Sequence, residues 1–193
     1  MAASAACACS EGRNEEQNAH SAFIRGGMRL EALNALDADA AARALGRCCG
    51  STRWAREMSA ARPFASAAAM SSVADAVWTG LDRADWLEAF ASHPRIGESA
   101  GAGRAGRWSG EEQRRVADAD ETTRIRLAQA NREYEARFGY IFIVCATGRG
   151  AGEMLGLLER RLTNDPAAET GVAAEEQRKI TRVRLAKLLE ENG

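Results

Sequence analysis

The sequence predicts an all-α fold, and three observations support that prediction. Apolar residues recur at spacings of three and four along most of the chain, alanine-rich stretches are frequent, and polar residues that can cap helices precede many segments. Alternation of apolar and polar residues, which is typical of half-buried strands, is almost absent. With 193 residues, of which 46% are hydrophobic, the chain is long enough for a single compact multi-helix domain with a buried core.

The predicted domain occupies residues 28–193. Residues 1–27 are rich in Ala, Ser, Gly and charged side chains without sustained periodicity, so we expect them to form a disordered arm. The predicted helices cover, in order, residues 37–46, 52–61, 65–80, 83–91, 110–118, 121–137, 151–162 and 166–190. The Gly-, Ala- and Ser-containing stretch 98–106 predicts a mobile loop, better interpreted as a linker than as a lid.

Local signals fix the ends of two of these helices. Ser51 can cap the second helix, and Pro63 ends it because proline disfavours helical geometry in the residue before it. Asp165 places a capping carboxylate ahead of Pro166, whose fixed φ suits a first helical turn. These caps give the predicted boundaries a physical basis.

The last predicted helix presents one stripe of side chains to the core. The stripe consists of Ala173, Gln177, Ile180, Arg184, Leu185 and Leu188. Arg184 should therefore point inward, where a guanidinium is costly unless an anion meets it. An internal salt bridge and a clamp for a substrate carboxylate both fit this position. Gly171 weakens the same helix by about 1 kcal/mol relative to alanine.

The apolar run 140–145 is ambiguous, because periodicity alone does not assign a short β-branched segment. A lone strand would have nothing to pair with, so we interpret the run as a buried helical or extended segment. It could supply main-chain donors and an apolar wall to a ligand. Cys145 is expected to be an inert buried thiol, since no histidine lies near it in sequence.

Charge and cysteine content disfavour several classes of partner and site. A net charge of -1 gives no general attraction to nucleic acid or to an anionic membrane, and no apolar run approaches the roughly 18 residues of a membrane span. The five cysteines include the adjacent Cys48 and Cys49, which disfavour a mutual disulfide and fit an intracellular protein without a secretory signal. With two histidines and no paired Cys-x-x-Cys motif, we expect no metal site.

His93 is the first candidate for chemistry. It stands just after the helix predicted over 83–91, and Pro94 moves it out of helical geometry. Its ordinary pKa near neutrality would let it transfer a proton at pH 7. The alternative is a helix-terminal histidine that contacts the last carbonyl groups, and the local pattern alone favours this alternative.

Ser109 and Glu112 are the second candidates, and they have the spacing of a capping box. The functional alternative is that Ser109, Glu112 and Gln113 present acceptors and amide donors at a helix N-terminus, where an anion is also favoured. The local pattern alone favours capping.

Six stretches follow one another in a recognisable order. They are Cys48-Cys-Gly-Ser-x-x-Trp54, Arg62-Pro-Phe64, Trp86-Leu-x-Ala-Phe90 with His93-Pro-x-Ile-Gly97, Ser109-x-x-Glu-Gln113, Tyr134-x-x-x-Phe-Gly-Tyr-Ile-Phe-Ile-Val-Cys-Ala146 and Glu176-Gln-x-Lys-Ile-x-x-x-Arg-Leu185. Over about residues 30 to 190, the chain thereby resembles the 2-oxo-4-hydroxy-4-carboxy-5-ureidoimidazoline (OHCU) decarboxylases. The sequence of these stretches is most similar to the decarboxylase half of bifunctional plant proteins, in which a transthyretin-like hydroxyisourate hydrolase domain follows the decarboxylase domain.

The resemblance implies an all-helical carboxy-lyase that needs neither metal nor organic cofactor and converts OHCU to (S)-allantoin and CO2 in urate degradation. It implies catalytic roles for His93 as acid/base, for Glu112 and for Arg184, and so outweighs the local alternatives. The substrate-binding positions that it implies are Pro94, Ser109, Gly110, Glu111, Glu112, Gln113, Phe142, Ile143, Val144, Cys145 and Ala146. Arg95 departs from the family pattern and would lower the pKa of His93 by adding positive charge beside it.

The expected partners are a small-molecule substrate, a second copy of the chain in a homodimer and, functionally, a hydroxyisourate hydrolase. The expected compartment is the cytoplasm or the peroxisome, although residues 190–193 do not form a Ser-Lys-Leu type signal. Two other interpretations remain open: a non-catalytic helical interaction module that keeps the scaffold, and an enzyme for a different ureido acid. The joint presence of His93, Glu112 and Arg184 argues against the module.

Overall fold

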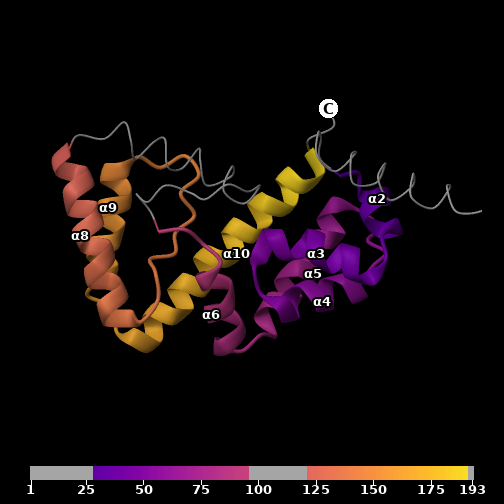
Figure 1. Ribbon diagram of the computed structural model, residues 1–193, viewed down its shortest axis with the longest axis horizontal. Coiled ribbons are helices and arrows are strands. Elements are labelled where there is room, and N and C mark those ends of the chain that lie inside the picture. The colour runs from indigo at the N-terminus through magenta and orange to yellow at the C-terminus, as the bar shows by residue number, and fades with distance from the viewer. Residues whose placement is uncertain (1–27, 96–120, 191–193) are drawn as a thin grey trace, which may run out of the picture.

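The computed structural model describes residues 28–95 and 121–190, and every regular element in these two ranges is an α-helix (Figure 1). The predicted all-α fold is confirmed there. The helices are α2 (Leu30–Ala35), α3 (Ala38–Cys49), α4 (Thr52–Ala60), α5 (Ala67–Thr79), α6 (Arg83–Ala91), α8 (Glu121–Phe138), α9 (Ala151–Arg161) and α10 (Pro166–Glu190). The expected arm at 1–27, the loop at 98–106 and the helix at 110–118 lie outside the described residues.

Helix ends follow the local chemistry of the sequence. Ser51 accepts a hydrogen bond from the main-chain N–H of Trp54 at 3.2 Å, and Asp165 accepts one from Ala167 at 2.9 Å, so both predicted caps are confirmed. Helix α3 runs three residues beyond its predicted end at position 46, because the left-handed residue that stops it is Gly50, with φ 89°.

Helix α2 was not predicted from the sequence. It has six residues and no side-chain cap, and the backbone becomes extended at Leu36, so neither periodicity nor capping marks it. The start of the described domain is nevertheless fixed, because the main-chain N–H of Met28 donates to the carbonyl oxygen of Leu188 at 2.8 Å. The two ends of the described fold therefore meet.

Helix α10 is the axis of the domain, and α3, α5, α6 and α8 all pack against it. In Figure 1 it crosses the molecule diagonally, with α2 to α5 around its C-terminal part and the α8–α9 pair beside its N-terminal part. Helix α6 lies near the middle of α10. The end of α6 and the inward face of α10 can therefore form one site.

Most core side chains are apolar, and the indole nitrogens of two buried tryptophans are hydrogen-bonded. The indole N–H groups of Trp54 and Trp78, which are 0% and 5% exposed, donate to the carbonyl oxygens of Ala74 and Ala174. Burying a large apolar side chain contributes roughly 1.5–3 kcal/mol, so these contacts hold α4 and α5 to the domain. No helix within the described ranges is long and apolar enough to traverse a membrane.

The stretch 140–146 is not helical and has no regular secondary structure, so the helical form of its interpretation is wrong. It begins at Gly139, whose φ of 78° turns the chain sharply after α8. Its side chains are buried apart from the partly buried Ile141 and Cys145.

Candidate active site

His93 lies at the C-terminal end of α6, as predicted. Its main-chain N–H donates to the carbonyl oxygen of Phe90 at 3.2 Å, which closes the last turn, and Pro94 then directs the chain out of the helix. Its side chain is partly buried, and the Nε2 atom is fully buried. The imidazole is thus presented to the interior by a helix end.

The turn between α3 and α4 packs closely against this helix end. A Cβ added at Gly50 would lie 2.6 Å from Cβ of Ser92 and 3.4 Å from the carbonyl oxygen of Ala89. Contacts below 3.0 Å are not tolerated, so Gly50 is required both for its left-handed backbone and for this approach. The absence of a side chain here sets the distance between α3 and His93.

Arg184 meets His93 across 91 residues of sequence. Its Nη2 atom lies 3.4 Å from Nδ1 of His93, and the side chain is 7% exposed, which confirms the inward orientation predicted from the stripe on α10. A guanidinium has no acceptor atoms, so this contact requires a lone pair on Nδ1. The contact joins two residues that lie far apart in the chain and for which the resemblance implies catalytic roles.

Burial and the Arg184 charge lower the pKa of His93 from 6.5 to about 3, and the Gln177 side chain opposes this shift. The imidazole is therefore neutral at physiological pH in the absence of a ligand. Arg95 was expected to lower the pKa of His93, but it is not among the groups that do so. Its guanidinium is held by Glu135 at 2.8 Å and 2.9 Å. The relevant cation is Arg184.

Gln177 lies two helical turns before Arg184 on the same face of α10 and is 0% exposed. Its amide nitrogen lies 3.3 Å from Oγ1 of Thr181 and 3.4 Å from the carbonyl oxygen of Cys49. Its place in the core stripe of α10 was predicted, but no role was predicted for it. A buried amide in an otherwise apolar stripe, seven residues before a buried arginine, was the available signal.

The segment Phe142, Ile143, Val144, Cys145 and Ala146 reaches the same region of α10. The main-chain N–H of Cys145 donates to Oε2 of Glu176 at 2.8 Å, which places the segment beside the residue that precedes Gln177. Burial raises the pKa of Glu176, but hydrogen bonds from Lys179 and Cys145 outweigh it and hold that pKa below its usual value. An ionised Glu176 thus anchors the segment.

A buried charged network holds the other side of this segment. Arg161, 8% exposed, donates to the carbonyl oxygen of Ile143 at 2.8 Å and pairs with the fully buried Glu169 at 2.7 Å. The hydroxyl of Tyr134 donates to the same carboxylate, and burial together with that bond raises the pKa of the phenol well above its usual value. This network was not predicted from the sequence, since an arginine in the last turn of a helix usually faces solvent.

Two of the three described cysteines, Cys48 and Cys49, are buried thiols. Cys48, Cys49 and Cys145 are free thiols. Burial raises the pKa of Cys48 to about 12 and that of Cys49 to about 11. Both are therefore protonated at neutral pH and are poor nucleophiles. Cys145 is partly buried rather than buried.

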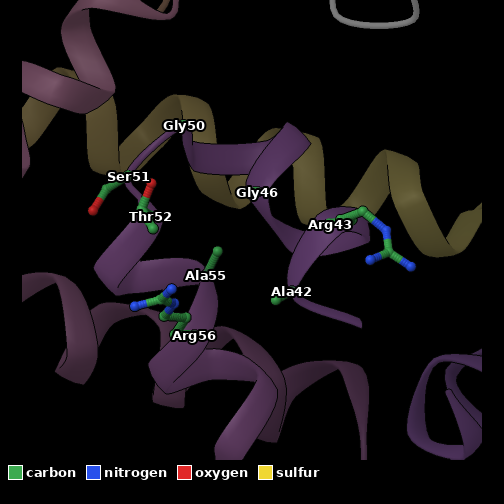
Figure 2. A pocket seen from close by; sticks show the side chains of 8 residues that line it. All are labelled: Ala42, Arg43, Gly46, Gly50, Ser51, Thr52, Ala55 and Arg56. Atoms are coloured by element: carbon green, nitrogen blue, oxygen red, sulfur yellow. The ribbon is translucent and has the colours of Figure 1, made fainter. Parts of the chain in front are cut away.

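A surface pocket of about 230 Å³ lies between α3 and α4 (Figure 2). Arg43, Gly46, Thr52 and Arg56 are among the residues that line it, and neither His93 nor Arg184 does. It is therefore separate from the candidate site. Within residues 28–95 and 121–190, no group of three metal-binding side chains is present.

Five of the predicted site residues lie outside the described residues, namely Ser109, Gly110, Glu111, Glu112 and Gln113. Those that the structure describes are His93, Pro94, Arg184 and the segment from Phe142 to Ala146, and helix α10 links them. Two main-chain groups of that segment are already engaged, the carbonyl of Ile143 and the N–H of Cys145.

Comparisons with known proteins agree on one family. The family model described as OHCU decarboxylase matches residues 34–186. The uric acid degradation bifunctional protein TTL of Arabidopsis thaliana is 39% identical over 150 residues, which are 76% of this chain and 46% of that protein, so the chain spans just under half of this relative. The Haloferax volcanii 2-oxo-4-hydroxy-4-carboxy-5-ureidoimidazoline decarboxylase is 25% identical over 82% of this chain and 95% of its own length.

Solved structures give the same result. A crystal structure of an OHCU decarboxylase in the presence of (S)-allantoin superposes with a TM-score of 0.67 at 37% identity, covering 76% of this chain and 96% of that chain. A crystal structure of (S)-allantoin synthase superposes with a TM-score of 0.64 at 18% identity, which supports the fold alone.

Proposed function

The chain belongs to the OHCU decarboxylase family, and we propose that it decarboxylates 2-oxo-4-hydroxy-4-carboxy-5-ureidoimidazoline to (S)-allantoin and CO2 in urate degradation. The observation that carries the proposal is the buried contact between Arg184 and His93 at 3.4 Å. It places a fixed cation beside a group that can transfer a proton. The proposed reaction removes a carboxylate and protonates a carbon, so it needs both a cation and a proton donor in one site.

The reaction breaks the bond between the carboxylate carbon and the hydroxyl-bearing ring carbon. The electron pair of that bond passes into the heterocycle as CO2 leaves, and the hydroxyl proton moves to a ring nitrogen as the hydroxyl becomes the ring carbonyl. A C–H bond forms on the ureido-bearing carbon when one further proton is delivered to one face. Because the product is a single enantiomer, the donor must be held in place. His93 delivers this proton, while Arg184 binds the substrate carboxylate and orients it.

Substrate binding explains how a neutral histidine becomes an acid. Burial and Arg184 together keep the pKa of His93 at about 3 in the empty site. A bound carboxylate offsets the positive charge of Arg184 and places a negative charge near the ring, and both effects raise the pKa of His93. The protonated form therefore accumulates only when the substrate is present.

The remaining site residues are proposed from the resemblance. Glu112, with Ser109 to Gln113, would orient the ring and ureido group through hydrogen bonds, and Pro94 would form part of the wall beside His93. The segment Phe142 to Ala146 would form the opposite wall. Support for the last assignment comes from its two anchors, Arg161 on Ile143 and Glu176 on Cys145, which hold it rigidly beside α10.

We further propose a homodimer in the cytoplasm or the peroxisome, working in sequence with a hydroxyisourate hydrolase that supplies its unstable substrate. The family resemblance supports these proposals. Sedimentation velocity of the full chain would test the dimer, and a single species at the monomer mass would contradict it.

The reaction itself is tested by product analysis. OHCU generated in solution should give stoichiometric CO2 and allantoin in the presence of the chain, faster than the spontaneous rate. Release of urea or ammonia instead of CO2 would support the alternative enzyme for another ureido acid. No acceleration of any reaction would favour the interaction module.

A further inference from the structure

Gln177 is held in a defined orientation inside the protein. Its amide nitrogen faces the carbonyl oxygen of Cys49 at 3.4 Å and the hydroxyl of Thr181 at 3.3 Å. A carbonyl oxygen can only accept a hydrogen bond, so the nitrogen rather than the oxygen of the amide must lie on that side. The amide oxygen of Gln177 consequently points away from Cys49.

That oxygen is buried, and so is Nε2 of His93. Both atoms lack a hydrogen-bond partner among the described residues. Buried polar atoms without partners are rare because the loss of hydration is not compensated. The two residues lie in the same region, because Gln177 contacts Cys49 and the next residue, Gly50, packs against Ser92, which precedes His93. The Gln177 side chain also counteracts part of the lowered pKa of His93.

The contact with Arg184 decides which atom of the ring carries the proton. The guanidinium lies 3.4 Å from Nδ1 of His93 and can only donate, so Nδ1 must provide a lone pair. A neutral imidazole then carries its single proton on Nε2. The unpartnered Nε2 is therefore a donor and the unpartnered oxygen of Gln177 is an acceptor, so the two are complementary.

We propose that Gln177 is a positioning residue of the reaction, whose amide oxygen accepts the Nε2–H of His93 and thereby holds Nδ1 toward Arg184 and the substrate. Its catalytic consequence rests on the proposed function, whereas the tautomer does not. In the reaction the Nδ1–H bond of the protonated ring breaks as the C–H bond of the product forms. The Nε2–H bond to Gln177 persists throughout and stabilises the positive charge of the ring.

The tautomer is measured by long-range ¹H–¹⁵N NMR of the full chain labelled with ¹⁵N-histidine. The sequence has two histidines, so a His20→Gln variant leaves the signals of His93 alone. At pH 7 we expect a protonated, pyrrole-like Nε2 and an unprotonated, pyridine-like Nδ1. A protonated Nδ1 would overturn the proposal whether or not the chain is active.

The role of the amide is measured with Gln177→Met, which keeps the volume and removes the acceptor. We expect kcat to fall at least tenfold while KM changes less than threefold, because Gln177 acts on His93 and not on the substrate. Gln129→Met, on the exposed face of α8, is the matched control and should stay within twofold of the parent chain. An unchanged kcat in Gln177→Met would overturn the proposal.

A second variant covers the case in which Gln177→Met does not fold. Thr181→Val removes one of the two acceptors that orient the amide, and we expect a mixture of both tautomers of His93 with a several-fold lower kcat. A pure Nε2–H tautomer with unchanged kcat in this variant would overturn the proposal. If the parent chain itself produces no allantoin, the proposed function fails, and the NMR result alone decides the pairing of Gln177 with His93.

Discussion

Arg184 and His93 lie 91 positions apart in the sequence, yet the guanidinium Nη2 and the imidazole Nδ1 lie 3.4 Å apart in a largely buried site. Helix α10 supplies the arginine from its inward face, and the end of α6 supplies the histidine. A fixed cation next to a neutral imidazole suits an anionic substrate that must also be protonated.

Arg184→Met should raise the pKa of His93 from about 3 by roughly one unit or more, because a positive charge beside the ring is removed. The same variant should lose about two to three orders of magnitude in kcat/KM, since the substrate carboxylate loses its counter-charge. NMR titration of His93 and steady-state kinetics measure the two effects. Arg182→Met, two positions earlier and half exposed, is the control and should change neither.

The lowered pKa of His93 also predicts how stability depends on pH. Below pH 6.5 the unfolded chain takes up a proton on His93, whereas the folded chain does so only near pH 3. Stability that is present above pH 6.5 is thus lost as the pH falls through this window, by up to about 1.4 kcal/mol per pH unit.

His93→Gln should therefore have a flatter dependence than the parent chain between pH 6.5 and pH 4 in urea unfolding. His20→Gln, in the arm predicted to be disordered, should keep the parent slope. Identical slopes for all three chains would show that His93 titrates normally in the folded protein.

Arg161→Met should destabilise the fold by about 3–5 kcal/mol, because it leaves the fully buried carboxylate of Glu169 without its charge partner. The double variant Arg161→Met with Glu169→Gln should recover part of this loss. Arg126→Gln removes a surface ion pair with Glu159 and should cost less than about 1 kcal/mol. Equal effects of the two single variants in urea unfolding would contradict the proposed structural role of the buried network.

Gly50→Ala should destabilise the domain by about 1–3 kcal/mol, since it combines a left-handed backbone with a clash against Ser92. Ser92→Gly in the same chain should relieve the clash and leave only the cost of the left-handed backbone.

Gly171→Ala should instead stabilise the domain by about 0.5–1 kcal/mol, because nothing lies near its added Cβ in α10. Thermal unfolding monitored by circular dichroism distinguishes the two signs.

The sequence predicted which face of the last helix is buried, because apolar residues that recur with a period of 3.6 mark the buried side of a helix. That is why the inward position of Arg184 on α10 was predictable. Periodicity does not report which elements meet, so the approach of His93 to Arg184 followed only from the family resemblance and then from the structure. Gln177 was placed correctly in the core stripe, but its role depends on its neighbours Cys49 and Thr181.

Arg161 shows a different limit of sequence reasoning. An arginine in the last turn of a helix is ordinarily interpreted as a solvated cation near the helix dipole. Its burial depends on Glu169, at the start of the next helix, and on the carbonyl oxygen of Ile143 in the segment 140–146. Such a network is a property of tertiary packing and carries no local pattern.

Optical activity followed during urate breakdown tests both the proposed decarboxylation and the role of His93. Urate is converted to OHCU by urate oxidase and a hydroxyisourate hydrolase, and the chain or its His93→Gln variant is then added. We predict rapid formation of optically active (S)-allantoin with the parent chain and slow, racemic formation with the variant. Racemic product at the spontaneous rate with the parent chain would contradict the account, and equal activity of the two chains would remove the role of His93.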